Sequence, residues 1–149
     1  MGVPLLYRVS SGLLVLFALG HHFGFRRVDP RWGADAVVAA MRGTRFEVQG
    51  FSRTYWDFFT GFGLFVTVFL LFAAALAWQL GGLPRDRLML LPVLRWALAI
   101  CSVGVAILSW QYFFIAPGVF SSAVAMCLVL AAWLGGKTLT AHPGNSRKV

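Results

Sequence analysis

Charged residues are scarce in this chain of 149 residues, and only five of them are acidic. Charged side chains make up 12% of the sequence, against about 25% in a typical soluble domain. Hydrophobic residues make up 59%, and the mean hydropathy is +0.77. So few polar side chains cannot cover a water-soluble globule, and so apolar a chain would not stay solvated as a disordered one. The composition excludes both classes and predicts a membrane protein.

Cysteine and catalytic motifs are equally sparse. The two cysteines, Cys101 and Cys127, are far apart in the sequence and fall near the middles of two apolar segments. Thiols in such surroundings react slowly, so these two are expected to be packing residues. No closely spaced set of metal ligands and no covalent cofactor motif occurs, so no metal site is expected.

Long apolar segments are what the sequence has in quantity. They cover about residues 4–23, 55–80, 88–114 and 118–139, and a membrane span needs about 20 residues. Breaks at Pro84 and Pro117 separate the last three segments. The pattern predicts an all-α integral membrane four-helix bundle that forms one domain over residues 1–149. The polar tail, 142–149, is expected to be flexible.

The long first loop, residues 24–54, is the only connection with room for structure. Asp29 followed by Pro30 is typical of a helix start, and a short helix is predicted over Pro30–Arg42. Its apolar positions indicate a helix that lies at the membrane interface or caps the bundle. These positions are Trp32, Val37, Val38 and Met41.

The formal net charge of +8 raises the question of a nucleic-acid partner. The thirteen basic residues lie at segment ends and in loops, without the single stripe that follows a phosphate backbone. Membrane lipids with anionic headgroups are the expected partners, and nucleic acid is not. Seven basic residues on one side against six on the other favour cytoplasmic termini. The seven are Arg8, Arg85, Arg87, Arg95, Lys137, Arg147 and Lys148.

Polar side chains gather at one end of the bundle if successive segments alternate in direction. The opposite half is almost purely apolar, which predicts a pocket with one polar end. Ionisable residues at membrane depth are functional candidates by default. The candidate ligand-binding residues are His21, His22, Arg53, Trp56, Asp57, Trp110, Gln111 and Tyr112.

Asp57 is the only acidic residue inside a predicted span. It either ties the start of its helix to Arg53 or to a loop amide, or it handles a proton or ligand. His21 and His22 point about 100° apart on a helix, so they face different neighbours. Either histidine could hydrogen-bond a loop carbonyl or serve as the proton partner of Asp57.

An aromatic stripe runs along the second segment. Its spacing of three and four residues keeps six aromatic side chains on one helix face. The stripe could pack against other segments, face lipid or line a slot for a flat ligand. Its members are Tyr55, Phe58, Phe62, Phe65, Phe69 and Phe72.

Two stretches resemble a known family. The runs from Phe17 to His21 and from Val48 to Phe58 are similar to a family of short, uncharacterised bacterial inner-membrane proteins with four predicted spans. The resemblance covers most of the chain and implies importance for His21, Trp56 and Asp57 without implying a reaction. A fainter similarity is to DoxX-like membrane proteins, some of which accompany quinone-linked oxidoreductases. The chain also has a weak likeness to sterol-isomerase-type bundles.

Three functions are carried forward. The first is binding of a lipid, a quinone or another apolar small molecule in the polar-ended pocket, or service as an accessory subunit of a larger membrane complex or homo-oligomer. The second is a small membrane enzyme that uses Asp57 and His21 or His22 for acid–base chemistry of isomerase or redox type. The third is a transporter subunit, for which the apolar half offers no polar route.

Overall fold

The computed structural model describes residues 2–136, so the tail 142–149 lies outside the described residues. Four long helices form the body of the molecule, and each is long and apolar enough to cross a membrane. They are α1 (Val3–Gly24), α3 (Tyr55–Gly82), α5 (Pro92–Tyr112) and α6 (Ile115–Gly135). The prediction of an all-α four-helix membrane bundle is confirmed.

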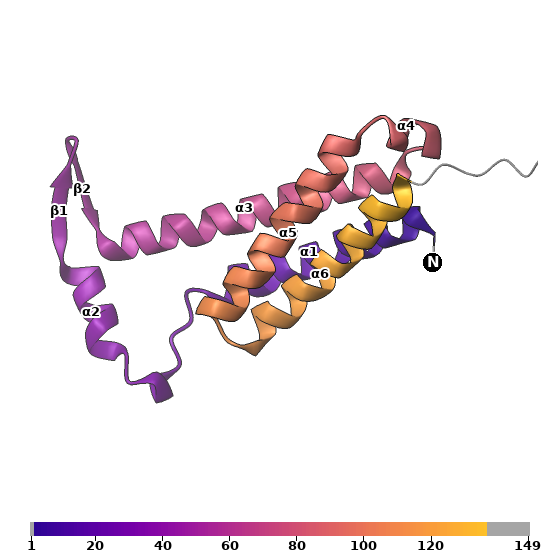
Figure 1. Cartoon of the computed structure of the whole chain (residues 1–149). Coiled ribbons are helices and arrows are strands. Elements are labelled where there is room, and N and C mark those ends of the chain that lie inside the picture. The colour runs from indigo at the N-terminus through magenta and orange to yellow at the C-terminus, as the bar shows by residue number, and fades with distance from the viewer. Residues whose placement is uncertain (1, 137–149) are drawn as a thin grey trace, which may run out of the picture.

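The contacts between the four helices give the order α3, α1, α6, α5. Figure 1 shows the path of the chain through them. α1 packs against both α3 and α6, and α5 packs against α6. α3 and α5 follow each other in the sequence, joined through the short helix α4 (Arg85–Met89). They do not pack against each other as extensively as the other neighbouring pairs do. The bundle is therefore open between α3 and α5.

Small side chains let α1 and α3 approach closely. A Cβ added at Gly81 would lie 3.1 Å from both the Pro4 carbonyl oxygen and the Tyr7 Cβ. The Ser11 hydroxyl donates to the Ala74 carbonyl oxygen across this contact at 2.8 Å. Close backbone packing and such hydrogen bonds hold helices together in lipid, where the surroundings are as apolar as the side chains.

Two buried side chains have polar atoms without a hydrogen-bond partner in the described chain, at the end of the bundle where α1 begins and α6 ends. Arg95 of α5 is 3% exposed, and its Nε and Nη1 form no hydrogen bond within residues 2–136. A Cβ at Gly135 would lie 2.7 Å from Nη1, so the guanidinium packs against the last turn of α6. The Tyr7 side chain is 0% exposed, and its hydroxyl is also unpartnered in the described chain.

Residues 30–54 fold into an arm with more structure than the sequence predicted. It contains a 3₁₀ turn (Pro30–Trp32), helix α2 (Asp35–Gly43) and an antiparallel hairpin of β1 (Arg45–Val48) and β2 (Phe51–Thr54). The helix predicted over Pro30–Arg42 is divided, because Gly33 adopts a φ of +62° and ends the first turn. The hairpin closes through Gln49 and Gly50, with φ values of +50° and +81°, as two-residue hairpin turns require.

The predicted helix start at Asp29 is present. Its carboxylate accepts the Arg31 backbone N–H at 2.9 Å and also pairs with the Arg31 guanidinium. These hydrogen bonds from Arg31, first from the side chain and then from the backbone, lower the pKa of the Asp29 carboxyl. Asp29 therefore stays ionised and caps the turn.

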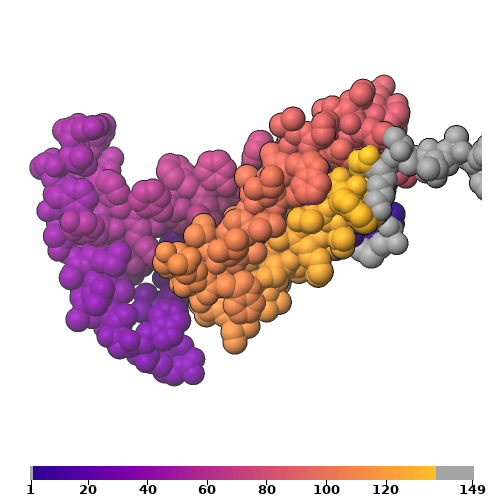
Figure 2. Space-filling view, viewed as in Figure 1, coloured from indigo at the N-terminus to yellow at the C-terminus, as the bar shows by residue number. Residues whose placement is uncertain are grey.

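The arm is attached to the first turns of α3. Both α2 and β2 contact α3, and the Phe46 ring of β1 packs on Tyr55 and Phe58 at centroid distances of 5.0 and 5.5 Å. The space-filling view shows the arm standing away from the end of α5 and α6 (Figure 2). α2 thus rests on α3 and does not cover the other helix ends.

Two helix boundaries differ from the predicted segments. The third span begins at Pro92 and not at residue 88, because proline cannot extend α4 but fits the first turn of a new helix. The sharp turn before α6 falls at Phe113 and Phe114, and Pro117 lies within the first turn of α6. Proline is tolerated there because the first backbone N–H groups of a helix lack partners.

The six aromatic side chains of the α3 stripe are all exposed on the chain. They do not fill the contact with α1, which uses Leu70, Ala74 and Ala77. Phe69 and Phe72 border the opening toward α5. The stripe therefore faces the surroundings of the chain along most of α3.

Candidate functional site

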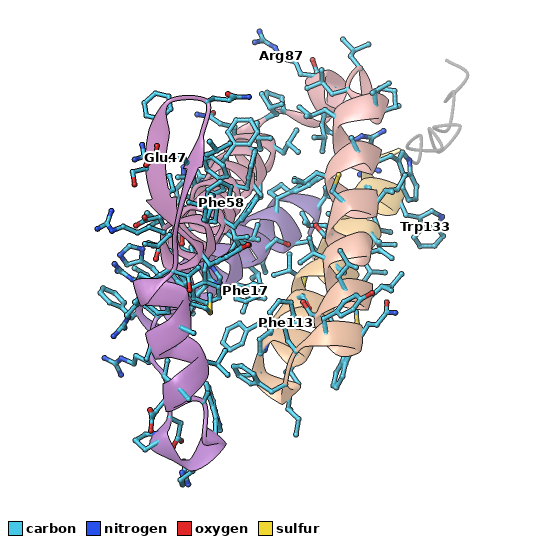
Figure 3. The ribbon with its side chains drawn as sticks, turned by 90° about the vertical axis from the view of Figure 1, so that its left-hand side faces the viewer. Phe17, Glu47, Phe58, Arg87, Phe113 and Trp133 are labelled. Carbon is cyan, nitrogen blue, oxygen red and sulfur yellow. The ribbon has the colours of Figure 1, made fainter. Side chains whose placement is uncertain are left out.

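The opening between α3 and α5 forms a groove of about 590 Å³, here called the α3–α5 groove. All four long helices contribute to its walls, which are almost entirely apolar. Phe17 and Phe113, labelled in Figure 3, line the end of the groove nearest the arm. Other wall residues are Phe69 and Phe72 of α3, Ala97, Cys101 and Leu108 of α5, and Ser121 of α6.

Polar groups lie toward one end of this groove. His21 near the end of α1, Ser109 near the end of α5 and Ser121 near the start of α6 are at the end nearest the arm. Leu76 and Leu94 line the opposite end. The groove therefore has an apolar length and a more polar end, the form typical of a site for a small molecule with one polar group.

His21 both joins α1 to α3 and faces the groove. Its Nε2 lies 2.9 Å from the Gly63 carbonyl oxygen. A carbonyl oxygen only accepts, so Nε2 carries the proton and Nδ1 of the neutral ring is an acceptor. The ring stacks on Phe25 at 5.0 Å with an interplanar angle of 13°.

Gly63 is required for this arrangement, because a Cβ there would overlap the Phe25 ring. We expect Gly63→Ala to lower the free energy of unfolding by about 1–3 kcal/mol, the usual cost of overpacking. Gly61→Ala is the matched control, since its new methyl meets no atom within 4 Å. It should be neutral or stabilise the helix by up to about 1 kcal/mol. Unfolding equilibria in mixed micelles measure both, and equal effects would contradict the close fit of Phe25 on Gly63.

His22 lies on a different side of α1 from His21, since successive residues of a helix point about 100° apart. Its Nδ1 is buried without a hydrogen-bond partner within residues 2–136, and so is the Thr60 hydroxyl of α3. Neither residue lines the α3–α5 groove. No group of three or more His, Cys, Asp or Glu side chains that could hold a metal ion occurs in the described part of the chain.

Asp57 caps the start of α3. Its Oδ2 accepts the Thr54 backbone N–H at 2.8 Å, and its own N–H donates to the Thr54 Oγ1 at 3.1 Å. This reciprocal pair is a capping box, which satisfies two backbone donors at once. Asp57 is exposed. Its hydrogen bond to the Thr54 amide matches the interpretation in which Asp57 ties the start of its helix to a loop amide.

Two other candidates, Trp56 and Arg53, lie near the same place. The Arg42 guanidinium of α2 lies 4.3 Å from the centroid of the Trp56 ring, and that ring packs on Phe59. Arg53 donates from Nη1 to the Ser52 carbonyl oxygen and stacks near Phe51. Trp56 therefore joins α2 to α3, whereas these contacts of Arg53 stay within its own strand, β2.

The remaining candidates lie at the end of α5. The Trp110 Nε1 donates to the Ser122 hydroxyl of α6 at 2.9 Å, and the indole lies against Gly118. Gln111 and Tyr112 are exposed. This group joins α5 to α6 near their turn.

The eight candidate residues are thus not gathered around one pocket. His21 alone among them lines the α3–α5 groove. The wall residues on α5 were missed, although Ala97, Cys101, Val105 and Leu108 repeat at spacings of four, four and three residues. That spacing puts them on one helix face and could have marked the groove.

The geometry described above consists of an apolar groove with His21 at its polar end, a capped α3 and an arm on its first turns. The structure shows a small protein whose four long helices, each long and apolar enough to cross a membrane, form an open bundle. Comparisons with protein-family models, with curated proteins and with solved structures find no match to this chain.

Proposed function

We propose that this small membrane protein binds a lipid-soluble molecule in the α3–α5 groove. A lipid, a quinone or another apolar compound with one polar group fits the chemistry of the walls. The observation that carries the proposal is the groove itself, because α3 and α5 stand apart and leave about 590 Å³ between them. Sites for small molecules typically enclose 300–1,000 Å³.

The polar end of the groove favours a head group that carries a hydroxyl. His21 presents Nδ1 as an acceptor when its Nε2 donates to Gly63. The Ser121 hydroxyl donates to the Pro117 carbonyl oxygen at 2.6 Å, so its oxygen is left to accept. A hydroxyl donor on the ligand would satisfy these acceptors, which supports the hydroxyl-bearing form of a quinone or a glyceride over a ligand with carbonyl groups alone.

The enzyme and transport hypotheses receive less support from the same geometry. Asp57, the proposed acid or base, is exposed and occupied by the capping box with Thr54. The groove walls are apolar along most of their length, which does not suit a polar substrate path. Binding is therefore the function that the arrangement supports best.

The proposed location is a bacterial inner membrane with both termini on the cytoplasmic side. In the sequence, the segments expected on the side of the termini carry seven basic residues, and the loop between α1 and α3 carries six. Cytoplasmic loops carry the excess of basic residues in such proteins.

A native mass spectrometry experiment tests the proposal, with a decyl-chain quinone and a monoacylglycerol as probes. We expect the wild-type protein to retain one equivalent of probe saturably. Ala97→Phe places a ring in the groove wall and should weaken retention by about tenfold or more, a loss of about 1.4 kcal/mol for each factor of ten.

Ile107→Phe is the matched control, because Ile107 is exposed on the same helix but does not line the groove. It should retain the probe as the wild type does. Retention that does not saturate, or that is equal in the two variants, would contradict binding in the groove. A protein of fixed mass that copurifies in place of small molecules would instead support the accessory-subunit role.

A further inference from the structure

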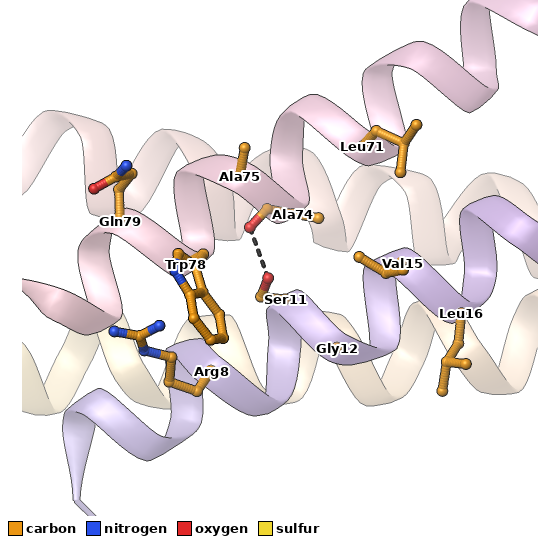
Figure 4. A pocket seen from close by; sticks show the side chains of 10 residues that line it. All are labelled: Arg8, Ser11, Gly12, Val15, Leu16, Leu71, Ala74, Ala75, Trp78 and Gln79. Carbon is orange, nitrogen blue, oxygen red and sulfur yellow. Dashed lines mark hydrogen bonds between the residues drawn. The ribbon is translucent and has the colours of Figure 1, made fainter.

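A second hollow lies on the face of the α1–α3 pair away from the α3–α5 groove. This trough holds about 670 Å³ and shares no lining residue with the groove. Figure 4 shows its polar side chains at one end, where Arg8 of α1 lies beside Trp78 and Gln79 of α3. Beyond them the floor and sides are small or apolar, formed by Gly12, Val15, Leu16, Leu71, Ala74 and Ala75. We call this feature the Arg8 trough.

The Arg8 guanidinium is held in a fixed place. Its Cζ lies 3.6 Å from the centroid of the Trp78 ring, a short cation–π contact. Its Cδ would lie 3.3 Å from a Cβ at Gly81, so the stem of Arg8 runs close along α3. Packing against α3 therefore fixes the position of the Arg8 guanidinium in the trough.

The same guanidinium lacks an anionic partner. Within residues 2–136 Arg8 forms no ion pair and no hydrogen bond. The nearby Ser11 hydroxyl is already committed, because it donates to the Ala74 carbonyl oxygen. The N–H donors of Arg8 thus have no acceptor among residues 2–136, although the side chain lines an apolar trough.

The charge lies near a helix end, from which an arginine side chain can reach the membrane interface. Arg8 lies five residues after the start of α1, and Trp78 lies four residues before the end of α3. At about 1.5 Å per residue, both are within roughly 8 Å of a helix end. Tryptophan concentrates at this interfacial level, and arginine extends its charge toward it. The apolar part of the trough runs about 12 Å deeper, from Arg8 to Leu16, at the same rise per residue.

We propose that the Arg8 trough binds one anionic phospholipid. The phosphate would pair with the Arg8 guanidinium, with the Gln79 amide as a second donor, and one acyl chain would lie between α1 and α3. Charge complementarity carries the choice of an anionic lipid, because the arginine is unpaired and the chain has a net charge of +8. Arginine pairs well with phosphate because its planar donors match two phosphate oxygens.

The test is native mass spectrometry of the full chain with phosphatidylglycerol and phosphatidylcholine of the same acyl chains. We expect the wild type to retain one phosphatidylglycerol with a preference of about tenfold or more over phosphatidylcholine. Arg8→Gln should abolish that preference. The matched control is Arg87→Gln, which removes an exposed arginine outside the trough and should leave the preference unchanged.

A second variant tests the acyl-chain part of the site. Gly12→Leu places a side chain in the trough, and its Cβ would meet no atom within 4 Å. It should reduce retention of both lipids by a similar factor while Arg8 is intact. Inorganic phosphate at millimolar concentration should not displace the lipid, since it lacks the chain.

Three results would overturn the proposal. They are equal retention of the two lipids by the wild type, equal loss of preference in the Arg8 and Arg87 variants, and displacement of the lipid by inorganic phosphate. Because the groove and the trough share no residue, Ala97→Phe should leave phosphatidylglycerol binding intact, so failure of one site leaves the other testable.

Discussion

Replacing Tyr7 with alanine should lower the free energy of unfolding by about 3 kcal/mol. Tyr7 is a fully buried side chain of α1, and its Cβ lies close to Gly81 of α3. Alanine would leave a void the size of the ring. The atoms that line this void would lose their packing partners in a lipid environment as they would in water. The value is at the low end for aromatic-to-alanine changes in cores, because lipid is apolar and the transfer contribution is smaller.

Tyr7→Phe separates the ring from its hydroxyl. The hydroxyl is buried and has no partner within the described chain, so its removal should leave stability unchanged or raise it by about 1 kcal/mol. Equilibrium unfolding of the two variants in mixed micelles measures both effects. A loss of more than about 1 kcal/mol in Tyr7→Phe would show that the hydroxyl has a bonding partner that residues 2–136 do not supply.

Arg95→Met should raise the free energy of unfolding by about 1–2 kcal/mol. The arginine is 3% exposed, and its Nε and Nη1 have no hydrogen-bond partner in residues 2–136. Replacing buried charges by apolar side chains of similar volume often stabilises proteins by about 1–4 kcal/mol. We expect the lower part of that range, because the guanidinium lies at the C-terminal end of α6, where the helix dipole favours a positive charge.

Arg87→Met is the control for this change, since Arg87 is exposed in α4 at the same end of the bundle. Its effect should stay within about 0.5 kcal/mol. Both are read from the same unfolding equilibria. If Arg95→Met instead lowers the free energy of unfolding by more than about 1 kcal/mol, the guanidinium binds an anion in the membrane. The expectation that its charge is uncompensated would then be wrong.

Hydropathy alone located the four spans, and the start of α3 at Tyr55 was placed correctly. The order of the helices was beyond the same signal. A helix in lipid is apolar all round, so no contrast between polar and apolar faces marks the packed side. Leu70 and Phe69 are adjacent and equally apolar in pattern, yet Leu70 is buried and Phe69 is exposed.

The candidate site was harder to predict because it depended on helix ends meeting at one level. Alternating directions were expected to bring Asp57 to the same face as His21, His22 and Gln111. In the structure α3 extends past its neighbours, so its capped start and the arm stand apart from the ends of α5 and α6 (Figures 1 and 2). The hairpin had only a weak sequence signal, since Gln49-Gly50 is a less typical turn than Asn-Gly or Asp-Gly.

The length of α3 ties the position of the arm to the thickness of the bilayer. Its 28 residues span about 42 Å, whereas the 21 residues of α5 or α6 span about 32 Å, close to a hydrocarbon layer of about 30 Å. The surplus of about 10 Å carries the hairpin and α2 beyond the other helix ends. In a thinner membrane, α3 must therefore tilt more, or the arm must stand farther above the bilayer surface. The lengths of the other three helices would still nearly match the hydrocarbon thickness.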